Sequence, residues 1–489
     1  MKQALIAALA VILVVTLSCQ KSPTTPSPSP HLQKPDTIDT AESGTLSIID
    51  DKGQPIVNAY ALIGKQASTE NSWLASDKNG QIVLPKTWTT PQDLTVEATD
   101  HVRITLKDQE PFGRTITLKK KSLFPRLNMK GTVHGITTKD KDGFIDFAIL
   151  LESMTKTDIL NFNINKVVSP WTEKISVAGF EFPVPQNLFI PKQKENYLFL
   201  TVTLQKPWFN LSYDSYGVKS VYSLQGKFPM KKVMTELQNK KPYYELVNHF
   251  DFSSAGRITH NFVANAAEPI VDTMQVKLNN TYTMKAPKIA AGQVLLGLSG
   301  FKEKNFYQPL DVKYMQSEQT VAFKTFSGVS PYFIGVVKNE NEFSADNADS
   351  ERMSISMNTP TTAVQSLPLI RNPSWINDKE LGIDIPIISS TEYSEQGMLV
   401  VISEMQDIKM DDGKTVRFKI PVWEIHAPSW SSQLVIPDIN TSTSPKRVEV
   451  TLLAKSIDNS GQQNAVTVVS THEDRIEKST HLTKSASDY

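Results

Sequence analysis

The chain has almost no cysteine. Cys19 is the only one in 489 residues, so no disulfide can form within the chain, and packed apolar cores must stabilise the fold. No segment reaches the roughly 18 consecutive apolar residues of a membrane-spanning helix. The chain also lacks an excess of either charge, with 51 basic and 51 acidic residues, so no basic surface for nucleic acid is expected.

Catalytic motifs are missing as well. The sequence contains no H-E-x-x-H, no His followed three residues later by Glu, no G-x-S-x-G, no phosphate-binding P-loop and no G-x-G-x-x-G. The eight histidines are scattered, and no cysteine beyond Cys19 can act as a nucleophile. These absences favour a function other than catalysis, with no cofactor.

The first nineteen residues have the pattern of a secretory signal. Lys2 precedes the apolar run from Ala4 to Leu17, which is too short to span a membrane, and Ser18 is a small residue before Cys19. Val15-Thr16-Leu17-Ser18-Cys19 resembles the lipobox of bacterial lipoproteins, although that family usually has Leu where Thr16 stands. The resemblance implies a signal peptide over 1–18 and a lipid on Cys19. The alternative is a plain signal peptide with a cysteine near its cleavage site.

The segment after Cys19 is a predicted tether. Residues 19–43 are rich in Pro, Ser and Thr, and Pro-rich linkers extend by ~3.1 Å per residue. The folded part can therefore lie up to roughly 70 Å from the lipid. Two or more acyl chains anchor a protein stably. Gln20, where an Asp retains enteric lipoproteins in the inner membrane, implies the outer membrane, on its periplasmic face or at the cell surface.

From Gly44 the sequence alternates between apolar and polar residues in short runs separated by Gly, Asn, Asp and Pro turns, which predicts antiparallel β-sandwiches. Residues 44–119 resemble the carboxypeptidase regulatory-like, or transthyretin-like, domain. The resemblance is carried by Asp51-Lys52-Gly53-Gln54-Pro55-Ile56, Asn58-Ala59 and Ser76-Asp77-Lys78-Asn79-Gly80-Gln81-Ile82. It implies a small β-sandwich that serves as an accessory or spacer. We expect it to have its own core, so that the rest of the chain folds without it.

The remaining chain is predicted to be mostly β, with few short helices. We divide it into a β-rich domain at 120–264, a sandwich-like module at 265–370 and a C-terminal β module at 371–489. Pro229–Gln238 is the one helix candidate in 120–264, because Pro suits a first helical turn. The polar tail from Thr471 to Tyr489 is expected to fray.

Three acids form a weak candidate for a calcium site. Asp140, Asp142 and Asp146 are spaced as D-x-D-G-x-x-D, and carboxylates at such spacing can ligate Ca²⁺. The spacing does not match the twelve-residue EF-hand loop. The alternative, a hairpin whose Asp-Gly adopts positive φ, is favoured.

Two further candidates are weaker still. Trp423 and Trp430 flank Glu424, His426 and Pro428, and exposed Trp would suit a sugar or peptide ligand, although Trp in a β chain is more often core. An acidic loop could gather a cation but is more often simply solvated; its acids are Glu340, Glu342, Asp346, Asp349 and Glu351.

We therefore expect a lipid-anchored envelope protein with a non-enzymatic binding, structural or spacer role. Its partners are the membrane and a protein, peptide or glycan ligand. One alternative is a hydrolase of polysaccharide or peptide with a site in 120–489, which a deep pocket with convergent carboxylates or histidines would favour. Another is an accessory subunit of an envelope secretion or transport assembly, which a large exposed apolar patch would favour.

Overall fold

The computed structural model describes most of the chain after residue 43: residues 44–65, 73–121, 127–135, 144–152, 155–156, 159, 173–177, 180–184, 189–190, 193–194, 198–200, 208–213, 216–304, 306–343, 351–358, 366–377, 381–385, 387–388, 392–409, 415–436, 446–457 and 472–488. The described residues are mostly β with only short helices, so the predicted fold class is confirmed. The chain divides into two compact units, unit 1 over 126–369 with 480–483, and unit 2 over 21–125, 370–479 and 484–489.

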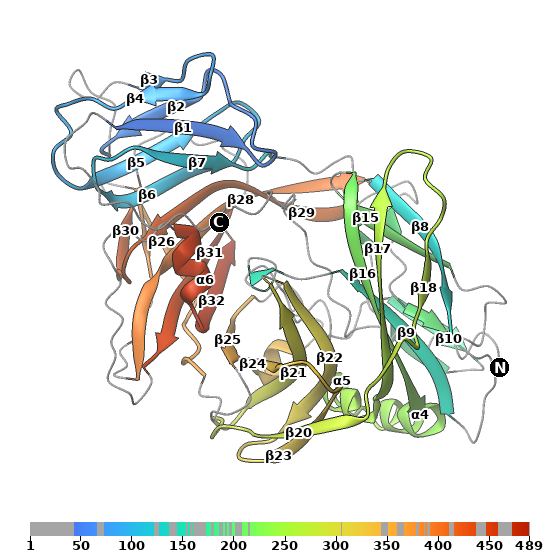
Figure 1. The fold of residues 1–489 in the computed structure, drawn as a ribbon. Helices are drawn as coiled ribbons and strands as arrows, with labels where there is room; N and C mark the ends of the chain where they lie inside the picture. The colour runs from blue at the N-terminus through green and yellow to red at the C-terminus, as the bar shows by residue number, and fades with distance from the viewer. Residues whose placement is uncertain are drawn as a thin grey trace. The chain divides into compact units, whose positions relative to one another are not determined.

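The N-terminal part of unit 2 is a β-sandwich (Figure 1, blue). Its strands are β1 (Thr45–Asp50), β2 (Tyr60–Ile63), β3 (Leu74–Ala75), β4 (Gln81–Val83), β5 (Gln92–Glu97), β6 (Arg103–Gln109) and β7 (Arg114–Leu118). One layer has the order β4-β1-β7, with β1 and β7 parallel, and the other runs β6-β5-β2-β3. The buried core between them draws only on residues between Leu46 and Leu118.

Two turns of the pattern Asp-x-x-Gly, at 50–53 and 77–80, shape this sandwich. Asp50 Oδ1 accepts the backbone N–H groups of Lys52 and Gln54, at 2.9 and 2.8 Å. Asp77 repeats the pattern at the next turn, and these backbone donors lower the pKa of its carboxyl group. Gly80 adopts a φ of +72°, and a Cβ there would lie 2.5 Å from the carbonyl oxygen of Ile48. The motif residues that carry the family resemblance thus build turns in this fold.

The C-terminal part of unit 2 is a second sandwich. Its elements are β26 (Ser374–Asn377), β27 (Leu381–Asp384), β28 (Tyr393–Lys409), β29 (Thr415–Ala427), β30 (Gln433–Val435), β31 (Lys446–Ser456), α6 (His472–Lys478) and the part of β32 (His481–Asp488) from residue 484 on. The sheet β26-β27-β30 packs on β31-β28-β29 around a core drawn from residues 370–452. The prediction of a frayed tail was wrong, because 472–488 forms α6 and the largely buried strand β32.

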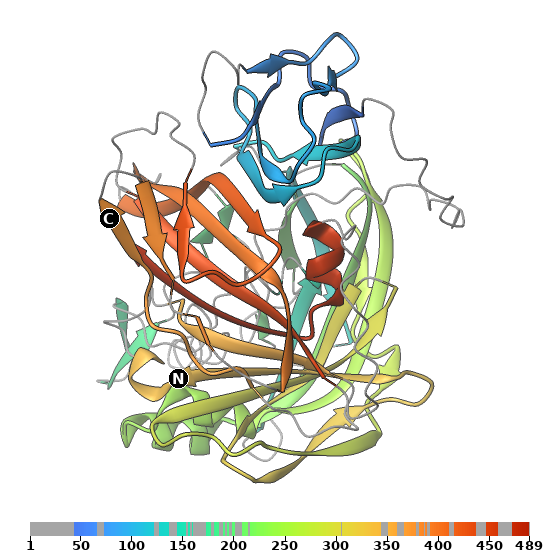
Figure 2. The same ribbon diagram turned by 90° about the vertical axis from the view of Figure 1, so that its left-hand side faces the viewer.

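The two sandwiches of unit 2 share one sheet. Strand β29 pairs in parallel with β6, from Trp423 opposite Arg103 to His426 opposite Leu106. The strand order is therefore β32-β31-β28-β29-β6-β5-β2-β3 across both. The alternation along β29 sends Trp423 and Ile425 into the C-terminal core, while Glu424 and His426 point to the opposite face. That face also carries α6 (Figures 1 and 2).

Unit 1 begins with two packed sheets, β14-β9-β16-β17-β19 and β15-β8-β18. Their strands and the other short strands of this part are β8 (Leu127–His134), β9 (Phe144–Glu152), β10 (Glu173–Val177), β11 (Phe180–Val184), β12 (Phe189–Ile190), β13 (Gln193–Lys194), β14 (Leu198–Leu200), β15 (Trp208–Tyr213), β16 (Gly217–Pro229), β17 (Asp251–Phe262), β18 (Ile270–Asp272) and β19 (Val276–Lys277). Residues such as Val133, Leu150 and Val271 fill the core. The predicted helix is confirmed as α4 (Met230–Gln238), which α5 (Tyr243–Leu246) and the 3₁₀ helix η2 (Val247–His249) follow.

The rest of unit 1 packs the two-stranded sheet β20-β23 against the sheet β22-β21-β24-β25. The elements are β20 (Asn280–Lys285), β21 (Gln293–Glu303), β22 (Phe306–Met315), β23 (Thr320–Thr325), β24 (Pro331–Asn339), the 3₁₀ helix η3 (Glu340–Phe343) and β25 (Met353–Asn358). Phe323 and Phe333 meet edge to face in this core, with ring centroids 5.5 Å apart.

Candidate functional site

Several predicted site residues lie outside the described residues, namely Cys19, Asp140 and Asp142. Asp146, the third member of the proposed calcium set, lies buried in β9, and its Oδ1 is 3.9 Å from Nζ of Lys227. Within the described ranges, no group of three or more His, Cys, Asp or Glu side chains could hold a metal ion.

The two tryptophans proposed as a ligand platform are structural. Trp423 is only 2% exposed, and its indole N–H donates to Oγ1 of Thr105 at 2.9 Å. Trp430 packs at the edge of the same C-terminal core, and its indole N–H donates to the carbonyl oxygens of Gly397 and Leu453. The platform interpretation of Trp423 was therefore wrong, because the burial of its ring leaves no face for a ligand.

The acidic loop is tied to its surroundings where it is described. Glu340 accepts a hydrogen bond from the Tyr244 hydroxyl at 2.7 Å. Oε1 of Glu342 lies 3.7 Å from Nη1 of Arg352, and Glu351 is buried. Asp346 and Asp349 lie outside the described residues.

The most unusual polar cluster is in unit 2, on the face of β29 that carries α6. We name it the β29 cluster: Lys119, Glu424, His426 and His472. Lys119 donates to Oε1 of Glu424 at 2.8 Å, and Nε2 of His426 lies 3.5 Å from the other carboxylate oxygen. The rings of His426 and His472 have centroids 4.4 Å apart. The cluster thus joins the end of β7, strand β29 and helix α6.

Burial and charge act in opposite directions on Glu424. Burial of its side chain, which is 15% exposed, disfavours the charged form. The Lys119 ammonium and the neighbouring His426 outweigh this effect and hold the pKa of Glu424 well below its usual range. The carboxylate therefore stays ionised at neutral pH and forms an ion pair with Lys119.

Burial dominates at His426. It disfavours the imidazolium, and His472 adds to this effect, so that the pKa of His426 falls to about 4 although Glu424 favours the charged form. His426 is 8% exposed, and its Nε2 has no hydrogen-bond partner among the described residues. At neutral pH the ring is therefore uncharged where it contacts His472 of α6. Among the described residues, no hydroxyl or thiol is hydrogen-bonded to Nε2, so His426 is not placed to deprotonate a nucleophile.

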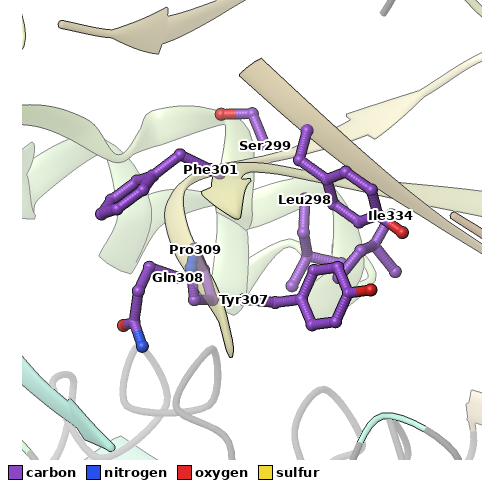
Figure 3. Close-up of a pocket in the computed structure, with 9 residues that line it drawn as sticks. Leu298, Ser299, Phe301, Tyr307, Gln308, Pro309 and Ile334 are labelled. Carbon is purple, nitrogen blue, oxygen red and sulfur yellow. The ribbon is translucent and has the colours of Figure 1, made fainter. Parts of the chain in front are cut away.

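Unit 1 has a small hollow lined by residues of β21, β22 and β24, among them Leu298, Tyr307 and Ile334 (Figure 3). Its volume is only about 10 Å³, roughly the space of one water molecule, which is far below the 300 Å³ or so of ordinary ligand pockets. Figure 3 shows the side chain of Gln308 directed away from the ring of Tyr307. The Gln308 amide is buried and makes no hydrogen bond among the described residues.

Another polar group, formed by Arg257, Glu303 and Tyr222, joins two sheets of unit 1. Arg257 donates to both carboxylate oxygens of Glu303, at 2.7 and 2.6 Å, and its guanidinium lies 5.1 Å from the centre of the Tyr222 ring. The Tyr222 hydroxyl also donates to Glu303 at 2.8 Å. These bonds raise the pKa of Arg257 and lower that of Glu303. The group satisfies its own charges, which suits a structural tie between strands.

No protein-family model matches the chain, and the search of curated proteins found no match. No helix in the described part of the chain is long and apolar enough to cross a membrane. The function therefore has to be argued from this chain alone.

Sequence reasoning missed the β29 cluster because its members are distant in the chain. Glu424 and Lys119 are 305 positions apart. One local signal was present: in 423–427, Trp423 and Ile425 alternate with Glu424 and His426, which predicts a strand with a polar second face. What covers that face could not be derived from the alternation.

Proposed function

We propose that this chain is a lipid-anchored bacterial envelope protein with a non-enzymatic binding, structural or spacer role. The observation that carries the proposal is Cys19, the only cysteine, at the end of a lipobox-like signal. A thioether on this thiol and an acyl chain on the new amino group would give more than one hydrocarbon chain, which anchors stably. The Pro-rich segment 20–43 would then separate the β modules from the membrane.

The β modules support the non-enzymatic part of the proposal. Sandwiches of this size offer large surfaces for partners, and the resemblance of 44–119 is to an accessory type of domain. In the described residues, the acids of the Arg257–Glu303 and Lys119–Glu424 pairs are engaged by cations of the same chain. These pairs supply stability rather than an acid and a base poised for chemistry.

Metabolic labelling with an alkyne-bearing fatty acid tests the anchor. The wild-type chain should take up the label and remain in the membrane fraction. Cys19→Ser removes the thiol, so the variant should carry no label. Ser22→Ala, in the tether, is the matched control and should label like the wild type. An unlabelled wild-type chain, or label that persists on Cys19→Ser, would contradict the proposal.

A further inference from the structure

The turn before β4 contains the only Asn-Gly pair of the chain, Asn79 followed by Gly80. The side chain of Asn79 is exposed, whereas Gly80 is buried in the N-terminal sandwich. Because glycine has no side chain, its backbone nitrogen is the least hindered nucleophile that can follow an asparagine. This pair is therefore the place in the chain where an asparagine amide reacts most readily with the main chain.

The reaction at such a pair is an intramolecular displacement of ammonia. The Gly80 nitrogen loses its proton and bonds to Cγ of Asn79, which gives a cyclic succinimide. The bond from Cγ to Nδ2 breaks, and Nδ2 takes up a proton and leaves as ammonia. Water then opens the ring at either of its carbonyl groups, so that position 79 becomes aspartate or isoaspartate. The reaction therefore needs water and no oxidant, reductant or cofactor.

The folded turn holds the reacting nitrogen in a hydrogen bond. The Gly80 N–H donates to the carbonyl oxygen of Asp77 at 3.0 Å, and the Gly80 carbonyl oxygen accepts the N–H of Ile48 in β1 at 2.8 Å. Oδ1 of Asp77 also accepts the backbone N–H groups of Asn79 and Gln81, each at 2.8 Å. Gly80 is thus fixed on both sides, and its nitrogen can attack Cγ only after the turn has opened.

We propose that Asn79 is a modification site gated by this turn, protected while the turn is closed and converted to aspartate or isoaspartate when it opens. Amide hydrogen exchange and succinimide formation both require the Gly80 N–H to leave its acceptor and lose its proton, so one opening equilibrium controls both.

The isoaspartate product would change the sandwich itself. It adds an extra carbon atom to the main chain beside Gly80, where even a Cβ would lie 2.5 Å from the carbonyl oxygen of Ile48. The turn has no room for a longer chain. Modification of Asn79 therefore loosens β4 from β1, with which it pairs directly after the turn.

Peptide mass spectrometry of the full chain tests the gate, because replacement of the amide by a carboxylate changes the mass of the peptide that contains Asn79. In a mildly alkaline buffer, the folded chain should react at Asn79 at least about tenfold more slowly than the same chain unfolded in guanidinium chloride. Equal rates in the two states overturn the proposal. So does an Asn79 that stays unmodified in the unfolded chain, since it would then be no modification site.

Variants at Asp77 separate the hydrogen bonds of the turn from its charge. Asp77→Ala removes the acceptor of two backbone N–H groups, so Asn79 of the folded variant should react faster, by about tenfold. Asp77→Asn keeps a side-chain oxygen without the charge and should react like the wild type. An Asp77→Ala chain as slow as the wild type, or an Asp77→Asn chain as fast as Asp77→Ala, overturns the proposal.

The turn at 50–53 supplies the matched control. Asp50→Ala removes the equivalent bonds to Lys52 and Gln54 from the same sandwich, and Asn79 should react as in the wild type. Equal acceleration by Asp50→Ala and Asp77→Ala would show unfolding of the whole sandwich and overturn the gate. Should Asp77→Ala fail to fold, hydrogen exchange of the wild-type Gly80 amide decides the matter. A Gly80 amide that exchanges as in the unfolded chain overturns the proposal.

Discussion

A single charged pair illustrates how residues of unit 2 depend on partners far away in the chain. Glu424 projects from β29 into a largely buried site, and Lys119, just after β7, supplies its countercharge at 2.8 Å. A buried carboxylate that loses its partner keeps its desolvation cost without compensation. The stabilising effect of Lys119 therefore depends on Glu424 being present.

The variant Lys119→Met tests this dependence. Because Lys119 is 38% exposed, solvent screening reduces its effect, and we expect the free energy of unfolding to fall by about 1–3 kcal/mol. Urea denaturation at pH 7 measures the loss. Lys119→Met combined with Glu424→Gln should recover most of it, and Lys52→Met, at an exposed turn, should change little. A double variant no more stable than Lys119→Met would contradict the pairing.

The stability that the Lys119–Glu424 pair contributes depends on pH. The pKa of Glu424 is depressed in the fold, so its ionised form contributes stability above the unfolded value of 4.5, and this contribution decreases as the pH falls below it. Burial lowers the pKa of His426 to about 4, so the stability that depends on its neutral form is present above pH 6.5. It is lost as the pH falls from 6.5 to about 4, which is before Glu424 is protonated. Acid should therefore act on buried His426 before it protonates Glu424 and breaks its pair with Lys119.

At the scale of elements, one strand crossing depends on a glycine. Strand β18 passes over the antiparallel pair β16–β17 so closely that a Cβ on Gly256 would lie 1.7 Å from the carbonyl oxygen of Asp272. The hydroxyl of Thr273 then donates to the amide oxygen of Gln225 at 2.7 Å. Any side chain at position 256 must push β18 away from the β16–β17 pair and from the core that Val271 fills.

Gly256→Ala should therefore lower the free energy of unfolding by about 2–4 kcal/mol, as overpacking against backbone does. Urea denaturation and amide exchange over 270–273 measure the two effects. Gly382→Ala, in β27, is the matched control, because its nearest neighbour would lie at an ordinary 3.4 Å. Equal stability of the two variants would contradict the close crossing.

The C-terminal elements show that the composition of a segment does not by itself decide whether the segment is ordered. The tail from Thr471 to Tyr489 is polar, and polarity with little apolar character usually indicates fraying. In the structure, residues such as Leu482 and Thr483 of β32 are fully buried, and α6 contributes Ile476. Strand pairing satisfies the backbone of β32, so a modest apolar content is sufficient there.

At the scale of the whole molecule, the sandwiches of unit 2 are less independent than their cores imply. Each core draws on its own stretch of chain. Yet β6 pairs with β29, Thr105 accepts the indole N–H of Trp423, and Lys107 reaches the carbonyl oxygen of Val435 at 3.4 Å. The N-terminal sandwich therefore covers an edge strand that the C-terminal one would otherwise expose.

Deletion of residues 44–121 tests this connection. From the sequence we expected the remainder to fold unchanged; from the shared sheet we expect β29 to lose a strand partner and Glu424 its cation. Amide exchange over 415–427 should accelerate by about tenfold or more, which corresponds to about 1.4 kcal/mol. Peptides of β21 in unit 1 serve as the internal control and should not change. Unchanged protection of β29 would show that the C-terminal sandwich is independent.

The sequence by itself determined the local features of this protein. Alternation predicted the β class, clusters of Gly, Asn, Asp and Pro predicted turns, and Pro229 with the apolar face after it predicted α4. The proposed lipid on Cys19 and the proposed tether after it likewise rest on neighbouring residues alone. Such features depend on φ/ψ preferences and side-chain order within a few positions, which the sequence states directly.

Only the tertiary structure decided which residues meet across the chain. Trp423 and Thr105 bond across 318 positions, and His472 of a predicted tail packs on His426. The same alternation at 423–427 suits an exposed aromatic platform or a buried strand, and the choice depends on which strand and which helix cover it. Those partners come from distant parts of the chain, where burial and charge compensation act together, so local pattern could not reveal them.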